Sequence, residues 1–220
     1  MIDRTGAGTG RLRILIADDH AILRFGLRRL LSEMDEVKAI GEAENGTRLQ
    51  QLLRDERWDV LLLDLDMPGP NTLDTLKRAK VDDPKLAVLI LSMYPEEQFA
   101  MRALKAGAAG YLNKKSAPDQ LMTAIRLIAS GGTYISAALA AALARNLQAR
   151  PLDTINELLT DREFSVLQGI AKGQSVSSIA ETLNLSAKTV STYRTRLLAK
   201  LGVGSNVELA RYAAAHGLVK

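Results

Sequence analysis

The chain has 220 residues, 47% of them hydrophobic and 25% charged, which is ordinary for a globular protein and excludes a disordered or fibrous chain. It contains no cysteine, so a disulfide framework and a thiolate metal site are excluded and a reducing, cytoplasmic location is expected. No apolar run is long enough to cross a bilayer, and the start of the chain lacks the apolar core of a signal peptide, so no membrane partner is expected. The net charge of +4 says little by itself.

The first 131 residues alternate between short apolar runs and longer amphipathic stretches. Strands that alternate with helices predict βαβ units, right-handed crossovers and a parallel sheet covered on both faces. We therefore expect a doubly wound α/β domain with five parallel strands over residues 11–131, after a flexible tail at 1–10. The predicted strands are 12–17, 37–43, 60–64, 87–92 and 110–113, and the predicted helices between them are 22–34, 47–54, 73–80, 96–106 and 118–128.

The pattern changes after residue 132. An alanine-rich stretch at 137–147 predicts a helix within a linker that spans 132–154. Residues 155–220 then show only helical periods, in four short segments, and predict a small all-α domain.

Four of the predicted strands end at residues that suit phosphate chemistry. Asp18 and Asp19 follow the first strand, Asp64 ends the third, Ser92 ends the fourth and Lys114 follows the fifth. Because ligands of a doubly wound sheet bind beyond the carboxyl ends of its strands, these side chains are expected in one crevice. Crowded carboxylates repel each other unless a cation neutralises them, and Mg²⁺ prefers such oxygen ligands. The ammonium and the hydroxyl would complete a pocket for a phosphoryl group.

The same cluster predicts a reaction. With a metal ion withdrawing charge, one carboxylate can attack phosphorus in line and become an aspartyl phosphate. The alternative is that each acid only caps a strand end or lies in a solvated loop. For one acid alone that alternative is the better one, whereas five matching positions favour the phosphoryl site.

The motifs that carry these residues resemble those of response-regulator receiver domains. They are ILIADDH (14–20), LLLDLDMPG (61–69), LILS (89–92) and GYLNKKS (110–116), in the order typical of that family and over nearly all of residues 12–130. The resemblance implies a flavodoxin-like strand order and a phosphoryl group that comes from a histidine of a partner kinase. It further implies that Asp64 is the phosphoacceptor, that Asp18, Asp19, Asp64 and the backbone carbonyl of Asp66 hold Mg²⁺, that Lys114 and Ser92 bond phosphoryl oxygens, and that Tyr111 swings inward as an aromatic switch.

One histidine stands directly beside the acid pair. His20 lies where the first helix is expected to begin, so we interpret it as a capping or surface residue rather than a metal ligand or phosphodonor.

The second domain carries the layout of a DNA-binding module. Thr160 and Glu163 form a capping-box pattern that opens a helix, which Gly173 ends. A short helix and a tight turn then lead to a longer helix at 187–201, and the second helix of such a helix-turn-helix enters the major groove. Between residues 186 and 202 there are basic residues and no acidic one, which suits contact with phosphates. The alternative is a polar surface helix of a protein-binding bundle.

The segment 159–203 resembles the LuxR-type domain of NarL/FixJ regulators, most specifically in SAKTVSTYRTRLLAKL (186–201). The resemblance implies a dimer contact by the last helix, at about 206–216. One departure is Ser178, where the family often has Glu. The residues expected to contact DNA are Lys188, Thr189, Val190, Ser191, Tyr193, Arg194 and Arg196.

Together these features predict a two-component response regulator that is not an enzyme. It would accept a phosphoryl group on Asp64 from a sensor histidine kinase and, as a homodimer, bind promoter DNA to regulate transcription. A phosphatase of the haloacid-dehalogenase type is one alternative, favoured by Asp64-Leu65-Asp66 but opposed by the Met67-Pro68 that follows. A ligand-sensing transcription factor is a second, opposed by an aromatic content of 4%. A receiver that binds DNA without phosphorylation is a third.

Overall fold

The computed structural model describes residues 11–68, 71–94, 96–137, 139–141, 159–183, 185–216 and 218. The expected tail at 1–10 and most of the expected linker lie outside these residues. The linker helix that the alanine-rich stretch predicts is helical at 137 and 139–141, and its remainder also lies outside them. No helix among the described residues combines the length and the apolar character that crossing a membrane requires.

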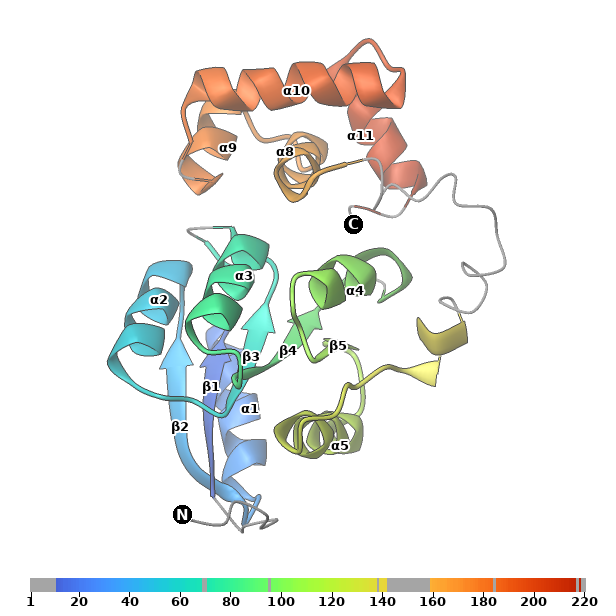
Figure 1. Cartoon of the computed structure of the whole chain (residues 1–220). Helices are drawn as coiled ribbons and strands as arrows, with labels where there is room; N and C mark the ends of the chain where they lie inside the picture. The colour runs from blue at the N-terminus through green and yellow to red at the C-terminus, as the bar shows by residue number, and fades with distance from the viewer. Residues whose placement is uncertain are drawn as a thin grey trace.

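The first domain is a five-stranded parallel sheet with the strand order β2-β1-β3-β4-β5 (Figure 1). This confirms the doubly wound fold with flavodoxin-like order. The three inner strands are almost wholly buried because they read as continuous apolar runs between two layers of helices. The strands are β1 (Leu12–Ala17), β2 (Val37–Ala43), β3 (Val60–Asp64), β4 (Ala87–Ser92) and β5 (Gly110–Asn113).

Two hydrophobic layers form because side chains alternate along each strand. Ile14 and Ile16 face one layer with residues of α1 and α5, whereas Leu15 and Ala17 face the other with residues of α2, α3 and α4. The helix ends differ from the predicted ones by one or two residues, as caps and turns fix them rather than the apolar period. The helices are α1 (Ala21–Ser32), α2 (Gly46–Asp55), α3 (Thr72–Asp82), α4 (Glu96–Lys105) and α5 (Pro118–Ala129).

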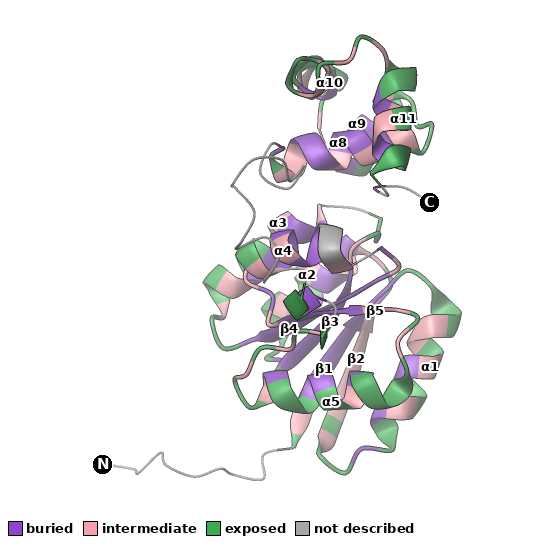
Figure 2. Cartoon of the chain, turned by 90° about the vertical axis from the view of Figure 1, so that its right-hand side faces the viewer, coloured by how far each residue is buried: buried purple, intermediate pink, exposed green. Residues whose placement is uncertain are grey.

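The second domain is all-α, as predicted, with α8 (Asp161–Ala171), α9 (Val176–Leu183), α10 (Ala187–Leu201) and α11 (Asn206–Ala215). The capping box is present: Thr160 accepts from the amide of Glu163, whose carboxylate accepts from the amide of Thr160. Gly202 ends α10 with a left-handed φ of 66°. Helix α8 lies at the centre and contacts the other three helices, and α10 lies on the side away from the first domain (Figure 2).

Candidate functional site

The predicted acids do meet at the carboxyl end of the sheet. Asp18 and Asp64 are buried, with 1% and 3% of their surface exposed, and Asp19 lies at the rim. The side chain of Lys114 reaches between the two buried acids, its Nζ at 2.6 Å from Asp18 Oδ2 and 2.8 Å from Asp64 Oδ2. The structure thus brings the ends of β1, β3 and β5 to one pocket, as the strand ends predict.

The pocket suits a divalent cation. The side-chain ligand atoms of Asp18, Asp19, His20 and Asp64 lie within 4.8 Å of one another. Lys114 Nζ forms ion pairs with Asp18 Oδ2 and Asp64 Oδ2, and neither oxygen has another polar partner among the described residues. Buried carboxylates that share one ammonium suit a hard cation such as Mg²⁺, which takes one or two carboxylates in typical phosphate sites.

Burial sets the protonation behaviour of the pocket. Removal from water raises the pKa of Asp64, and the charge of Asp18 adds to this, while Lys114 opposes it. Burial works in the other direction on Lys114, but its contacts with Asp18 and Asp64 outweigh that effect and raise the pKa of the lysine. The lysine therefore stays charged and holds two carboxylates that would otherwise repel each other.

His20 lies at the N-cap position of α1, but its side chain makes no capping hydrogen bond. Its Nδ1 lies instead 3.1 Å from Asp18 Oδ1 and 2.8 Å from Asp19 Oδ1, while 67% of the side chain is exposed. The expectation of a surface residue is met, and the expectation of a side-chain cap is not.

Ser92 and Tyr111 lie behind the acids and share a partner that sequence analysis missed. The buried Tyr111 points inward and its hydroxyl donates to the carbonyl of Tyr94 at 3.1 Å. The Oγ of Ser92 accepts from the amide of Tyr94 at 3.2 Å. Tyr94 is therefore held from both sides by the two predicted switch residues. An aromatic two residues after the predicted Ser92 is the only signal the sequence offers for this.

Asp66 links the pocket to the helical domain. Its amide donates to Asp64 Oδ1 at 3.3 Å, and its carboxylate accepts from the hydroxyl of Tyr94 at 3.2 Å. The same oxygen accepts from Lys172 Nζ at 3.1 Å, and Lys172 stands at the end of α8 in the second domain. Nothing local in the sequence predicts a contact between residues so far apart.

Helix α8 docks on α3 and α4 of the first domain. The ring of Phe164 meets that of Phe99 edge-on, with centroids 5.2 Å apart. Arg102 of α4, 5% exposed, lies over the Phe164 ring and donates to the carbonyl of Leu159 at 2.7 Å and to Asp161 at 3.1 Å. Two ion pairs and one hydrogen bond surround the contact between Arg102 and Phe164. The ion pairs are Lys77–Asp161 and Arg162–Asp74, and the hydrogen bond is Asn71–Ser165.

The predicted DNA-contacting residues lie on α10. Lys188, Ser191 and Arg196 are exposed, whereas Thr189 and Tyr193 are half-buried. Ser186 caps the helix by accepting from the amide of Thr189 at 3.1 Å. Helix α10, which carries these exposed residues, lies on the side of the domain away from the receiver (Figure 2).

Two of the residues predicted to contact DNA, Val190 and Arg194, are less exposed than a DNA contact requires or are already bonded within the domain. Val190 has 0% exposure and packs in the core, so it positions α10 and has no surface to offer DNA. The resemblance implies a DNA contact at Val190, but this residue stands seven positions before the buried Leu197 and therefore lies on the inner face of α10. Arg194 is half-buried and its Nε donates to Asn206 of α11, which fixes the guanidinium in place.

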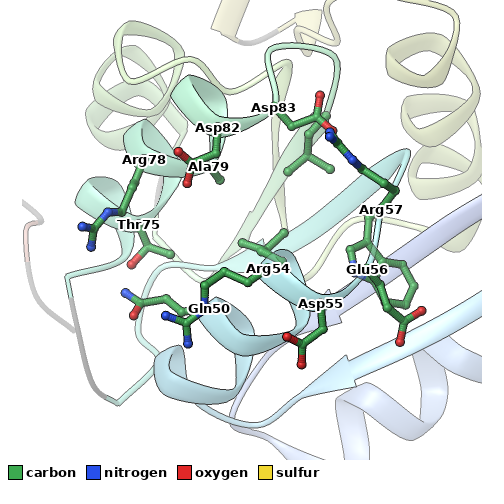
Figure 3. Close-up of a pocket in the computed structure, with 13 residues that line it drawn as sticks. Gln50, Arg54, Asp55, Glu56, Arg57, Thr75, Arg78, Ala79, Asp82 and Asp83 are labelled. Atoms are coloured by element: carbon green, nitrogen blue, oxygen red, sulfur yellow. The ribbon is translucent and has the colours of Figure 1, made fainter.

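Two hollows lie in the part of the surface that the described residues form. A groove of about 580 Å³ lies between α2 and α3, where Arg54 and Arg78 project and Arg57 pairs with Asp83 at 2.9 Å (Figure 3). Trp58 lines it, 7% exposed, with its Nε1 donating to the carbonyl of Leu52 at 3.1 Å. The second hollow, about 310 Å³, lies where the domains meet and has Asp19, Asp66 and Lys172 in its wall. The larger groove contains none of the acids of the pocket.

Comparison with known proteins follows the same division of the chain. Residues 14–126 match the response regulator receiver domain, and residues 157–213 match the bacterial regulatory proteins of the luxR family. UvrY of Escherichia coli K12 is 36% identical over 94% of this chain and 95% of its own length. GacA of Pseudomonas aeruginosa PAO1 is 35% identical over 94% and 98%. The chain belongs to the NarL/FixJ family of response regulators. It is a response-regulator transcription factor and not an enzyme.

Among solved structures, this response regulator is similar to RcsB of Salmonella enterica serovar Typhimurium. RcsB bound to the rprA promoter with the phosphomimetic BeF₃⁻ gives a TM-score of 0.72 at 28% identity, covering 93% of this chain and 99% of RcsB. Another RcsB structure reaches 0.76 at 30% identity, covering 94% and 98%. An RcsB–DNA complex gives only 0.59 at 29% identity over 93% and 98%, close to the 0.56 of the isolated receiver, which covers 60% of this chain.

Proposed function

We propose that the pocket accepts a phosphoryl group on Asp64 from a sensor histidine kinase. The single observation that carries this proposal is the buried pair Asp18–Asp64, whose Oδ2 atoms both contact the ammonium of Lys114 at the carboxyl end of the sheet. In the reaction an Asp64 carboxylate oxygen forms a bond to phosphorus while the bond from phosphorus to the donor imidazole nitrogen breaks. The released imidazole takes up a proton, and the product is an aspartyl phosphate.

The surrounding residues have separate tasks in this step. Asp18, Asp19 and Asp64, with the backbone carbonyl of Asp66, would hold Mg²⁺, which when bound offsets the charge between the carboxylates and the incoming phosphoryl oxygens. Lys114 pairs with a phosphoryl oxygen, and the hydroxyl of Ser92 donates to another. Tyr111 donates to the carbonyl of Tyr94, and Ser92 accepts from the amide of the same residue. A movement of Ser92 would therefore reach Tyr111 through the backbone of Tyr94.

We further propose that the chain binds promoter DNA as a homodimer, in the cytoplasm, through α10. The relative RcsB is seen bound to promoters, and the family supports the same role here. The contacts would come from Lys188, Thr189, Ser191, Tyr193, Arg194 and Arg196, with α11 as the dimer contact. Cations on a helix exposed to solvent can reach phosphates, and the hydroxyls beside them can reach base edges.

The phosphoryl step is tested by mass. Wild type and Asp64→Asn are incubated with Mg²⁺ and acetyl phosphate, and their intact masses are compared. Wild type is expected to gain one phosphoryl group, with acetate as the leaving group, and Asp64→Asn is expected to gain none. A gain in both proteins would contradict Asp64 as the acceptor.

A further inference from the structure

The docked face of α8 leaves the DNA-binding surface open. The hydrogen bonds, ion pair and ring contact around Arg102 and Phe99 of α4 involve α8 and the segment before it, and α9 lines the hollow beside them. Helix α10, with its exposed Lys188 and Arg196, lies on the opposite side of the domain (Figures 1 and 2). Docking in this form therefore does not cover the surface that we assign to DNA.

The docked face is connected to the phosphoacceptor through one aromatic residue. The ring of Tyr94 stacks on Phe99 with centroids 4.4 Å apart, and Phe99 in turn meets Phe164 of α8. The hydroxyl of Tyr94 and the ammonium of Lys172 share one oxygen of Asp66, and Lys172 also lies 5.8 Å from the centre of the Tyr94 ring. Tyr94 thus contacts Lys172 of the helical domain directly, and it is linked to Phe164 through Phe99 of the receiver.

The backbone of Tyr94 is held by the residues that face the phosphoryl site. Ser92 accepts from its amide, and Tyr111 and Asn113 both donate to its carbonyl, Asn113 at 3.2 Å. A serine hydroxyl accepts and donates at the same time, so Ser92 can bond a phosphoryl oxygen without releasing Tyr94. A phosphoryl group on Asp64 would then add a partner to a network that already positions Tyr94 against α8.

The domain arrangement agrees with this direction of coupling. The two RcsB complexes formed on promoters with the phosphomimetic align with the whole chain at TM-scores of 0.72 and 0.73, above the 0.59 of another RcsB–DNA complex. One further RcsB structure reaches 0.76, as expected if two arrangements are in equilibrium and a ligand shifts their populations.

We propose that phosphorylation of Asp64 strengthens the docking of α8 on the receiver, through Ser92, Tyr94, Asp66 and Lys172, and so fixes α10 in an outward orientation for DNA. The inference rests on the proposed phosphorylation of Asp64 and adds the direction in which phosphorylation shifts the docking of the two domains. Phosphorylation would clamp the two domains together instead of releasing one from the other.

The test follows the docked population with two dyes. Because the chain has no cysteine, Gln51→Cys on α2 and Ala199→Cys on α10, both exposed, give two labelling sites away from the interface. Single-molecule energy transfer then measures the ratio of docked to undocked molecules. Mg²⁺ with BeF₃⁻ is expected to raise this ratio by roughly five-fold or more, a typical allosteric coupling. A fall in the ratio would overturn the proposal, because it would show release.

The coupling residue is tested by Lys172→Met. This variant removes the charge that reaches Asp66 and is expected to lower the docked ratio about three-fold without BeF₃⁻, the effect of a partly exposed ion pair. The response to BeF₃⁻ should also shrink. Lys105→Met, an exposed lysine of α4, is the control and should leave both values unchanged. If Lys172→Met behaves as wild type, Lys172 is not part of the coupling and the proposal fails as stated.

Failure of the proposed function is separable from failure of this inference. A wild type that gains no phosphoryl mass fails the proposed function, while the effect of Lys172→Met without BeF₃⁻ still shows whether the contact between Lys172 and Asp66 holds the docked arrangement. A wild type that gains the mass but shows no rise in docking retains the function and overturns the clamp.

Discussion

The two charged regions of this protein use their charges in opposite ways. In the receiver, Asp18, Asp64 and Lys114 are removed from water and arranged before any ligand arrives. On α10, Lys188 and Arg196 stand in solvent. A buried arrangement costs stability and gains a site of fixed geometry, whereas an exposed one costs little and is adjusted when DNA binds. Variants of the two regions should therefore differ in what they change, stability or binding.

The largest expected effect is a loss of stability when the buried Lys114 of the receiver is replaced. Lys114→Met would leave two buried carboxylates without their cation and lower the free energy of unfolding by about 3 kcal/mol, measured by urea denaturation. Added Mg²⁺ should recover part of the loss in this variant, because a divalent cation can neutralise the same oxygens. Lys115→Met, its exposed neighbour, should stay within about 0.5 kcal/mol of wild type. Equal losses in the two variants would show that burial of Lys114 is not the cause.

Glu163 sharpens the comparison because it is a buried charge inside the DNA-binding domain. Its carboxylate, 2% exposed, closes the capping box and pairs with Lys200 at 2.6 Å. Glu163→Ala should lower the free energy of unfolding by about 2 kcal/mol, since it loses both a cap and a charged hydrogen bond.

The pH dependence of this contribution has a defined sign. Burial acts to raise the pKa of Glu163, but Lys200 and Thr160 outweigh it and hold the pKa below the ordinary 4.5. The unfolded chain therefore binds a proton first, so the stabilisation is present above pH 4.5 and is lost as the pH falls through the lower folded value. The difference in stability between wild type and Glu163→Gln should shrink below pH 4.5. A difference that is constant with pH would contradict the charged pair.

On the exposed side, binding should change and stability should not. Lys188→Ala and Arg196→Ala are each expected to weaken DNA binding by about five-fold on any sequence and to lower the salt slope by about one, if each contacts a phosphate. Fluorescence anisotropy at several salt concentrations measures both. Lys105→Ala, on the receiver, should bind DNA as wild type does. A loss confined to one DNA sequence would assign the residue to a base edge instead.

The smallest expected change in stability is at Ser178, where the chain departs from the family pattern. Ser178 lies in the first turn of α9, and this turn contains no acidic residue. Ser178→Glu would place a negative charge at the positive end of this helix and should raise the free energy of unfolding by about 0.3–1 kcal/mol. Thermal denaturation at low and high salt measures this, and the gain should fall as salt screens the charge.

Much of the fold could be predicted because its signals are local. The five strands have the predicted bounds, most plainly β3 and β4, whose continuous apolar runs suit strands that are buried on both faces. The pocket followed from the strand ends alone. Val190 was misassigned because a resemblance names positions without stating which face of the helix they occupy. The contacts of Lys172, Tyr94 and Arg102 could not be predicted, because they depend on where one domain lies against the other.

The single tryptophan, Trp58, gives the molecule an optical label on one side only. It is buried beneath the groove between α2 and α3, in the receiver, and the helical domain has none. Tryptophan emission therefore follows the melting of the receiver alone, while far-ultraviolet circular dichroism follows both domains. Coincident curves would mean that the two domains unfold as one cooperative unit, and separate curves would mean that each keeps its own melting point.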